Sequence, residues 1–445
     1  MLNYTDQLAT ILPCGLEGSV VRVVGMAAAV ADLPAPLGAL VEIDVQRGEP
    51  LEAEVIGFDG GATLVYPFAS LAGVRRGHRV RLRRTSNRMG VGHELLSRIV
   101  DARGRAIDGR PPPVTTERIA LDGPPPRPVE RPRIDTPLTT GIRAIDGLLT
   151  CGKGQRMGIF SGSGVGKSVT LGIMSRHSSA DVNVIALIGE RGREVNEFIE
   201  RDLGPEGLAK SVLVVATSDE PALLRVRAAF AATAIAEFFR DQGNDVLLVM
   251  DSITRFALAQ REIGLTAGEP PTTRGFPPSV FALLPKLVER AGRGPRGSIT
   301  AFYSVLVEAD DANEPIADAL RGLLDGHTWL SRKLATKGHY PPIDVLESTS
   351  RLMSDVTTPQ HREAAAVVLE LLAAHRDHED LISIGAYRRG ANRVVDLAIE
   401  MLDPIHEFLR QRVDQHGSIE SARESLIRLR ARCDERPTVT PENAT

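Results

Sequence analysis

Five short segments in the middle third of the chain are apolar at nearly every position, at residues 156–160, 182–188, 212–216, 246–250 and 299–307. The stretches between them have helical spacing and predict helices at 167–176, 193–201, 222–240 and 278–291. Strands that are apolar on both faces and alternate with helices are typical of a mainly parallel sheet covered on both sides. Ligands bind beyond the carboxyl ends of the strands in such sheets. The pattern therefore predicts an α/β domain with its site at that edge.

The flanking parts of the chain follow different patterns. Short β-branched runs separated by turn residues predict a small N-terminal β-barrel, at 19–24, 39–45, 51–56, 63–66 and 79–82. A proline-rich linker follows at 108–137, and its shortage of backbone donors predicts a strap without regular structure. From about Arg362 the apolar residues recur at helical spacing, at 364–374, 394–402 and 405–413, and residues 434–445 have the character of a loose tail.

These patterns predict three parts. We expect a β-barrel domain at 1–92, an α/β domain at 93–360 that includes the linker, and a helical domain at 361–445. A chain of 445 residues is long enough for about three domains of ordinary size.

Composition narrows the possible partners. The chain is 42% hydrophobic and 25% charged, as in soluble globular proteins, and its formal charge of −4 argues against broad attraction to nucleic acid or anionic lipid. No nucleic-acid partner is therefore expected. Three cysteines, far apart and without a CxxC pair, indicate neither a disulfide framework nor a zinc site, and they favour a reducing, cytosolic compartment. The N-terminal residues lack a basic region, and no uninterrupted apolar stretch of about 18 residues occurs, so we expect membrane association only through partners or surface contacts.

A glycine-rich loop, SGSGVGKS, lies directly after the apolar segment 156–160 and before a predicted helix. The loop and the next helical residue comprise Ser161, Gly162, Ser163, Gly164, Val165, Gly166, Lys167, Ser168 and Val169. The glycines let backbone N–H groups converge on an anion, and the helix N-terminus adds its positive dipole end. Lys167 can then reach the β- and γ-phosphates of a nucleotide, while the Ser168 hydroxyl can ligate Mg²⁺.

One residue departs from the usual phosphate-loop pattern, because Ser161 stands where that pattern has glycine. A serine is tolerable there only if its backbone is not forced to positive φ. A glycine-rich turn without a nucleotide is the alternative, but the strand, the glycines, the GKS sequence and the helix together favour phosphate binding.

Two carboxylates follow predicted strands. Asp251 ends the apolar run 246–250 and would hold Mg²⁺, although an aspartate at a strand end is also a common turn or helix cap. Glu190 follows the run 182–188, where a glutamate beside a γ-phosphate suits a general base for the attacking water.

The charges around Glu190 allow a second interpretation. Glu190 and Glu194 could simply pair with Arg191 and Arg193 on the surface, as most such charge runs do. Spacing alone leaves these two interpretations open.

Further motifs accompany the loop in a fixed order: PLTTGIRAID at 137–146, GKGQRMGIF at 152–160, GERGRE at 189–194, DSITRFA at 251–257 and GHYPPIDV at 338–345. Together they resemble the ATPases of bacterial type III secretion. That family includes the flagellar export ATPase and the injectisome ATPases, and it is related to the catalytic β subunits of rotary ATP synthases. The similarity covers roughly residues 18 to 430. It implies a RecA-like ATPase domain between the β-barrel and the helical domain.

The resemblance implies roles for individual residues. The loop and Asp251 would bind ATP and Mg²⁺, Glu190 would activate water, and Arg191 would lie close to the γ-phosphate. Tyr340, in GHYPPID, matches the aromatic residue that stacks on adenine. Its alternative is an ordinary core tyrosine packed beside the two prolines that follow it.

Arg351, in STSRLM, matches the family's arginine finger, which a neighbouring subunit supplies to the γ-phosphate. An isolated arginine would usually be a solvated side chain. A finger supplied by a second copy implies that the isolated monomer is nearly inactive.

The resemblance also implies partners and a place in the cell. We expect a homohexamer that contacts a central stalk, peripheral stator-like proteins, export chaperones, substrate proteins and, indirectly, the membrane export gate. It would be cytoplasmic and peripherally associated with the inner-membrane export apparatus. The loop 266–278 would face the central channel of the ring, with an ordinary surface loop as the alternative.

Several features favour one branch of the family. Regulatory subunits of rotary ATPases have glutamine in the region of Glu190, and this chain has the carboxylate. The small residue Ser161 and the absence of the acidic stalk-contacting motif of synthase β subunits favour export. The segment 147–155 and the overall similarity slightly favour the flagellum over the injectisome. A rotary-synthase β subunit, an RNA-moving ring helicase and a docking platform that binds nucleotide without hydrolysing it are the alternatives.

Overall fold

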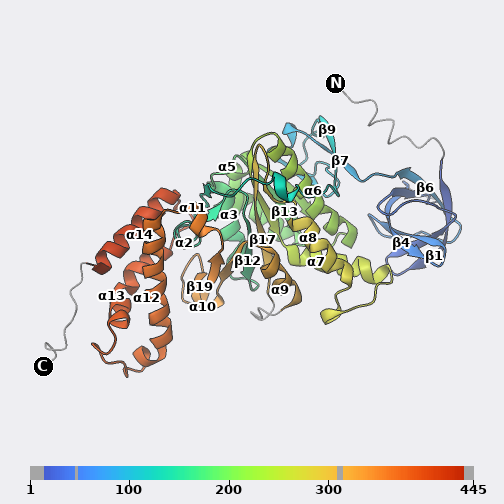
Figure 1. Ribbon diagram of the computed structural model, residues 1–445. Helices are drawn as coiled ribbons and strands as arrows, with labels where there is room; N and C mark the ends of the chain where they lie inside the picture. The colour runs from blue at the N-terminus through green and yellow to red at the C-terminus, as the bar shows by residue number, and fades with distance from the viewer. Residues whose placement is uncertain (1–14, 46–48, 308–313, 435–445) are drawn as a thin grey trace.

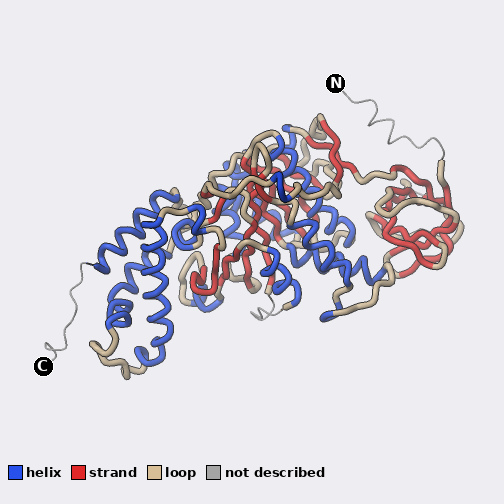
Figure 2. The backbone as a smooth tube through the Cα atoms, viewed as in Figure 1, coloured by secondary structure: helices blue, strands red, loops and turns tan. Residues whose placement is uncertain are grey.

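The computed structural model describes residues 15–45, 49–307 and 314–434. In Figure 1 the chain forms three parts in a row: a β-barrel, a central sheet between helices, and a group of helices that ends the described chain. Figure 2 shows that strands are confined to the first two parts. The predicted loose tail beyond Asp434 and the N-terminal residues 1–14 lie outside the described residues.

The barrel closes from six strands in the order β1-β2-β5-β4-β3-β6. Their bounds are β1 Glu17–Val24, β2 Ala27–Ala31, β3 Leu40–Ile43, β4 Leu51–Asp59, β5 Ala62–Pro67 and β6 Arg79–Arg84. The five predicted β-branched runs are confirmed. The sequence pattern did not reveal β2, because its sequence AAAVA has low β propensity, yet its first four residues are buried.

The linker was predicted to lack regular structure, and this is wrong at β9 (Glu117–Ala120) and at the short helix η2 (Pro128–Glu130). The four residues of β9 contain no proline, so they keep the N–H donors that pair β9 with β7 (Arg88–Val91). The short helices η1 (His93–Leu95) and η2 (Pro128–Glu130) flank this ribbon. A buried ion pair links the start of the linker to β8 (Arg98–Asp101), because Arg98 Nε lies 2.6 Å from Asp108 Oδ2.

The central sheet has the order β19-β18-β12-β17-β15-β13-β14-β8. The strands not yet bounded are β12 Arg156–Ser161, β13 Val182–Ile188, β14 Ser211–Ala216, β15 Asp245–Asp251, β17 Ser298–Leu306, β18 Gly326–Leu330 and β19 Ile343–Ser350. Neighbours from β18 to β8 are parallel, whereas β19 runs antiparallel to β18. The short β16 (Gly292–Arg293) pairs with β17, and β10 (Pro137–Leu138) pairs with β11 (Cys151–Gly152). The predicted mainly parallel sheet is confirmed.

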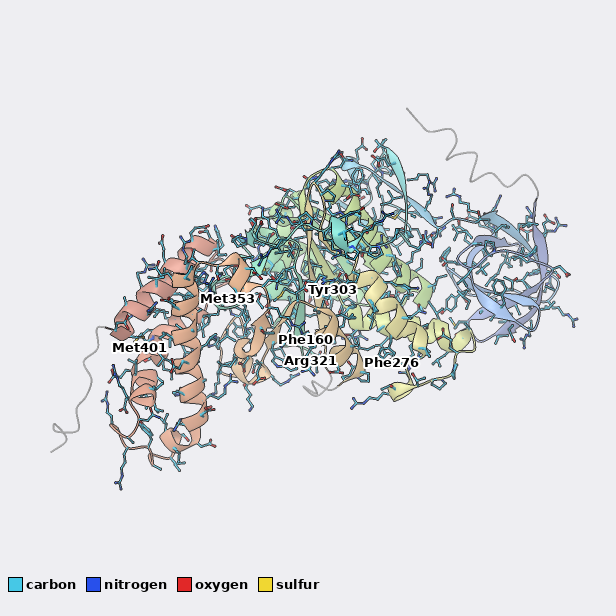
Figure 3. All side chains as sticks on the ribbon, in the orientation of Figure 1. Phe160, Phe276, Tyr303, Arg321, Met353 and Met401 are labelled. Atoms are coloured by element: carbon cyan, nitrogen blue, oxygen red, sulfur yellow. The ribbon has the colours of Figure 1, made fainter. Side chains whose placement is uncertain are left out.

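Helices cover both faces of this sheet because successive strand side chains point to opposite sides. Val184 and Ala186 of β13 pack with the helices of one face, α6 Ala222–Asp241, α7 Ile253–Thr266, α8 Pro278–Val288 and α9 Pro315–Leu323. Ile185 and Leu187 pack on the other face, with α2 Arg143–Leu148, α3 Lys167–His177 and the C-terminal helices. Figure 3 shows Phe160 of β12 and Tyr303 of β17 inside this central part.

The predicted helix at 193–201 is interrupted in the structure. The segment divides into α4 (Gly192–Glu197), a π-helical stretch η3 (Phe198–Leu203) and α5 (Gly204–Ala209). Such π-helical turns are often found at functional sites. The loop 266–278 is irregular as predicted, apart from one short turn, η4 (Thr273–Gly275).

The C-terminal part consists of α12 Pro359–Ser383, α13 Arg393–Leu409 and α14 Ile419–Asp434, preceded by the short α10 Arg332–Thr336 and α11 Met353–Val356. The predicted helical character is confirmed, but the two segments 394–402 and 405–413 form one helix that continues through Pro404 and ends at Leu409. Met401 lies among these helices, and Met353 lies where they meet the central part (Figure 3). No helix in the described ranges is long and apolar enough to cross a membrane.

Gly172 of α3 is packed so closely that we expect no room for a side chain at this position. A Cβ at Gly172 would lie 2.5 Å from the backbone oxygen of Asp202, whereas a Cβ at Gly322 of α9 would meet nothing within 4 Å. Gly172→Ala should therefore lower the free energy of unfolding by about 1–3 kcal/mol. The matched control Gly322→Ala should raise it by about 0.5–1 kcal/mol, because alanine favours the helix. Urea unfolding followed by circular dichroism measures both, and equal effects would contradict the packing argument.

Candidate nucleotide site

The carboxyl edge of the central sheet brings three predicted segments together. The phosphate loop follows β12, Asp251 is the last residue of β15, and Glu190 lies two residues beyond β13. In the sheet order β12-β17-β15-β13, the register pairs Leu187 with Asp251. Segments that are far apart in the sequence therefore meet at the same carboxyl edge of the sheet, as the pattern of parallel strands predicted.

The loop has the backbone that its glycines allow. Gly164 and Gly166 have φ values of 75° and 105°, where a side chain would be strained. Ser161 ends β12 as extended strand and is not among the residues with positive φ, so the condition for a serine there is met. Its hydroxyl oxygen is buried and has no hydrogen-bond partner among the described residues. Helix α3 begins at Lys167, so its first N–H groups adjoin the loop.

Lys167 links the two carboxylates. Its Nζ donates to Asp251 Oδ1 in a very short contact and lies 3.4 Å from Glu190 Oε1. All three side chains are largely buried. Burial disfavours the charged ammonium, but the carboxylates of Asp251 and Glu190 outweigh that effect and raise the pKa of Lys167 above its usual value. Lys167 is therefore a permanent cation between two acidic groups.

The pKa of the Glu190 carboxyl lies near neutral pH. Burial, the nearby Asp251 carboxylate and a hydrogen bond with Glu194 together raise the pKa of Glu190 to about 7, against the opposing effect of Lys167. The same hydrogen bond lowers the pKa of Glu194. A carboxylate with a pKa near neutrality is well matched to accept a proton from water.

A small cavity of about 100 Å³ adjoins this cluster, and its lining includes Ser168, Glu190, Glu194 and Asp251. The Ser168 hydroxyl and the Asp251 carboxylate are hard oxygen ligands of the kind that Mg²⁺ prefers. The residues present therefore fit a magnesium ion beside a phosphate, with Ser168 and Asp251 as the residues that would hold it.

Arg191 lies outside the Lys167 cluster. Its side chain is 81% exposed and lies 3.3 Å from Glu194, and Arg193 similarly lies near Glu197. Surface pairing thus describes the two arginines, but Glu190 is paired with Lys167 and is only 15% exposed. A role for Arg191 at the γ-phosphate stays a prediction.

Tyr340 is not a core residue. Its side chain is 51% exposed, and it lies beside the phosphate loop, because a Cβ placed at Gly166 would be 3.8 Å from both Tyr340 and Pro342. An exposed aromatic ring next to the loop is available for stacking on a base. The stacking itself stays a prediction.

Arg351 lies at the opposite edge of the sheet from its own phosphate loop. Its N–H donates to the carbonyl of Asp325, whose own N–H donates to Arg156 at the start of β12. The loop begins at Ser161, the other end of that strand, which is about 16 Å away for five residues of strand. The exposed Arg351 side chain donates to the Arg321 carbonyl at 3.2 Å. It cannot reach the loop of its own chain.

Comparison with known proteins agrees with this geometry. Residues 141–350 match the model of the ATP synthase alpha/beta family, nucleotide-binding domain, and residues 357–428 match that of the T3SS EscN ATPase C-terminal domain. The "Flagellum-specific ATP synthase" of Bacillus subtilis is 49% identical over 93% of this chain and 94% of its own length. The "Type 3 secretion system ATPase" of Xanthomonas euvesicatoria is 50% identical over 94% and 95%. The chain belongs to the family of type III secretion and flagellar export ATPases.

The solved structures extend this likeness to the whole fold. The assembled ATPase EscN of the enteropathogenic E. coli type III secretion system matches with a TM-score of 0.88 and 46% identity, covering 93% of this export ATPase and 99% of the EscN chain. EscN in complex with its central stalk EscO matches with a TM-score of 0.86 and 45% identity, over 93% and 99%. The predicted fold is confirmed. The domain boundaries at 92 and 360 stay predictions.

The motif reasoning did not assign roles to two arginines near the site of this export ATPase. Arg255 of α7 passes so close to Gly189 that a Cβ there would lie 2.9 Å from the Arg255 Cβ, and its buried Nε has no partner among the described residues. Arg332 of α10 donates to the Ser163 carbonyl at 3.1 Å. Arg255 belongs to the DSITRFA motif, four residues after Asp251, and this position in the motif is a sequence signal for a residue near the site. No local signal places Arg332 beside the loop.

The raised pKa of Glu190 in this export ATPase predicts a pH-dependent stability. Since the folded pKa is about 7 against an ordinary 4.5, the folded state holds the proton more tightly. Ionisation of Glu190 therefore lowers the free energy of unfolding. This loss grows as the pH rises from 4.5 to 7 and is complete above pH 7. Glu190→Gln should be more stable than the wild type by about 1–3 kcal/mol at pH 8.5 and equally stable near pH 4.5.

Urea unfolding at a series of pH values measures this difference. The control is Glu197→Gln, because Glu197 is half-exposed and, in the part of the chain that the structure describes, forms an ion pair only with Arg193. A stability difference for Glu190→Gln that does not change with pH would contradict the burial argument.

Proposed function

We propose that this chain hydrolyses ATP to power protein export through a type III secretion apparatus, flagellar or injectisome, as a homohexameric ring. The observation that carries the proposal is the buried cluster of Lys167, Glu190 and Asp251 beside a phosphate loop in a member of the export ATPase family. A protein that only held nucleotide would not need a carboxylate with a pKa near 7 at this position.

The charges of the cluster suggest how the residues act. Phosphate oxygens of ATP compete with Asp251 and Glu190 for the Lys167 ammonium, and a bound Mg²⁺ would neutralise the phosphates next to Ser168 and Asp251. Once Lys167 turns to the phosphates, Glu190 is free to take a proton from a water molecule. The water oxygen bonds to the γ-phosphorus as the bond to the β–γ bridging oxygen breaks, which gives ADP and phosphate.

Each active site would form between two copies of the chain. Arg351 is remote from its own loop and exposed, so a neighbouring ring member has to receive it. Tyr340 would hold the adenine on the loop's own side. The similar EscN structures, one of the assembled ATPase and one in complex with its central stalk EscO, support a ring around a stalk.

The remaining parts of the proposal concern the cellular setting. We infer a cytoplasmic enzyme, peripherally attached to the export apparatus, that releases substrates from chaperones and contacts stalk and stator-like proteins. The loop 266–278 would face the central channel. Flagellar and injectisome relatives match with nearly equal identity, so the small preference for the flagellum rests on segment 147–155 alone.

Replacing the base should separate binding from turnover. Glu190→Gln is expected to bind ATP with near wild-type affinity while its kcat falls by about 10²–10⁴, because the amide cannot accept the proton from water. A fluorescent ATP analogue measures binding, and phosphate release measures turnover. Persistent hydrolysis in this variant would remove Glu190 from the role of base.

A finger supplied by a neighbour predicts complementation between two inactive variants. Arg351→Ala and Lys167→Ala should each lose activity, the former by about 10³–10⁵ in kcat. When they are mixed in equal amounts, about a quarter of the interfaces combine an intact loop with an intact finger. The mixture should therefore recover about a quarter of the wild-type ATPase activity.

The double variant Lys167→Ala/Arg351→Ala provides the control for this experiment. Mixed with Arg351→Ala, it offers no intact finger and should restore nothing. Failure of the two single variants to complement at any mixing ratio would count against a site shared between subunits.

A further inference from the structure

A second cavity, of about 770 Å³, lies between the edge of the central sheet and the C-terminal helices. Its lining comes from β18, α10, the segment after α10, β19, α12 and α13, and from Arg321 near the end of α9. Trp329, Leu372 and Leu402 give it an apolar wall. The volume falls within the range of about 300–1,000 Å³ that small-molecule sites occupy.

The lining is strongly cationic. Six of its residues are lysine or arginine and three are acidic. All three carboxylates are already paired, since Arg376 binds Asp344 and Glu347, and Lys337 binds Glu379. Within the described ranges, neither the Lys333 ammonium nor the Arg410 guanidinium forms an ion pair with a carboxylate within 4 Å, although Lys333 contributes to the lowered pKa of Glu379. The cavity therefore presents uncompensated positive charge beside an apolar wall.

One lining residue, His339, carries a buried polar atom without a partner in the described chain. His339 is only 3% exposed, and its Nε2 has no hydrogen-bond partner among the described residues. Its ring meets the His406 ring at right angles, with the centroids 5.4 Å apart. Burial, His406 and Arg410 lower the pKa of His339 to about 4, so at neutral pH the ring is uncharged and can present one N–H. Leaving such a group unpaired is costly, which favours a ligand.

We propose that this cavity binds a compact oxyanion of the phosphate or carboxylate type. Nε2–H of His339 donates to an oxygen of the anion, and Arg410 and Lys333 supply the positive charge. The site is distinct from the phosphate loop but adjoins it, because the lining residue Arg332 donates to the Ser163 carbonyl of that loop. It adjoins the base side of the nucleotide site, because Tyr340 directly follows His339 and the Tyr340 carbonyl accepts from the N–H of Gln411, the neighbour of Arg410.

The chain contains an internal probe for this site. Trp329 is its single tryptophan and lines the cavity. We would titrate the full-length Lys167→Ala variant, in which the phosphate loop is disabled, with potassium phosphate or potassium citrate and follow Trp329 emission. Potassium chloride of equal ionic strength corrects for general salt effects. Because no hydrolysis is measured, the result does not depend on the proposed function.

A saturable change in emission with phosphate or citrate, absent with chloride, is the expected result. Phosphate alone would identify a phosphate site, citrate alone a carboxylate site, and both a general oxyanion site. His339→Phe keeps a ring against His406 but removes the donor, and Arg410→Gln removes the charge. Added to the Lys167→Ala chain, each should weaken binding at least tenfold.

Arg428→Gln is the matched control, since Arg428 is exposed on α14 and, among the described residues, its side chain hydrogen-bonds only to Ser425. It should leave the titration unchanged. Circular dichroism should first show that the Arg410→Gln and Arg428→Gln proteins are folded. Two outcomes would then overturn the proposal: no saturable change in emission beyond that with chloride, or equal affinity in these two proteins.

Discussion

The contact of Lys167 with Asp251 and Glu190 is the interaction on which the site depends. Two carboxylates buried at the edge of a sheet are stable only with a cation between them, and Lys167 provides one from the first residue of α3. Its compensation is incomplete, because the pKa of Glu190 stays near 7. Phosphate oxygens can therefore replace the two carboxylates as partners of Lys167, and a divalent cation can replace Lys167 as the partner of the carboxylates.

The parallel sheet determines how far apart the two halves of the proposed composite site lie. β12 starts beside Asp325 and Arg351 and ends at the phosphate loop, so one strand length separates the finger from its own loop. This separation follows from the antiparallel turn between β18 and β19, which returns the chain to the amino edge of the sheet. A strand that ran parallel there would have carried Arg351 to the loop edge.

Local patterns predicted the elements that hydrophobicity defines. The apolar runs of β12, β13, β14, β15 and β17 were apparent because both faces are buried, and the loop motif fixed α3. The alanine-rich β2 and the interrupted helix at 192–203 follow from tertiary packing, so no local pattern predicted them. The exposure of Tyr340 and the distance of Arg351 from its loop depend on pairings between distant segments. The cavity beside His339 needs α13 to pack next to the segment after α10, which spacing along the chain does not encode.

The helical domain holds both halves of the proposed composite site. Arg376 of α12 contacts Asp344 at 2.5 Å and Glu347 at 3.2 Å, both on the strand that leads to Arg351. Gln411, just beyond α13, donates its N–H to the Tyr340 carbonyl, and its side chain accepts from the N–H of Arg143. The Arg376 pairs are partly exposed and so individually weak, whereas Gln411 is buried and fully bonded. The helical domain is therefore tied more firmly to the base side of the site than to the strand that ends at Arg351. A displacement of α12 and α13 would therefore break the Arg376 pairs before the Gln411 hydrogen bonds.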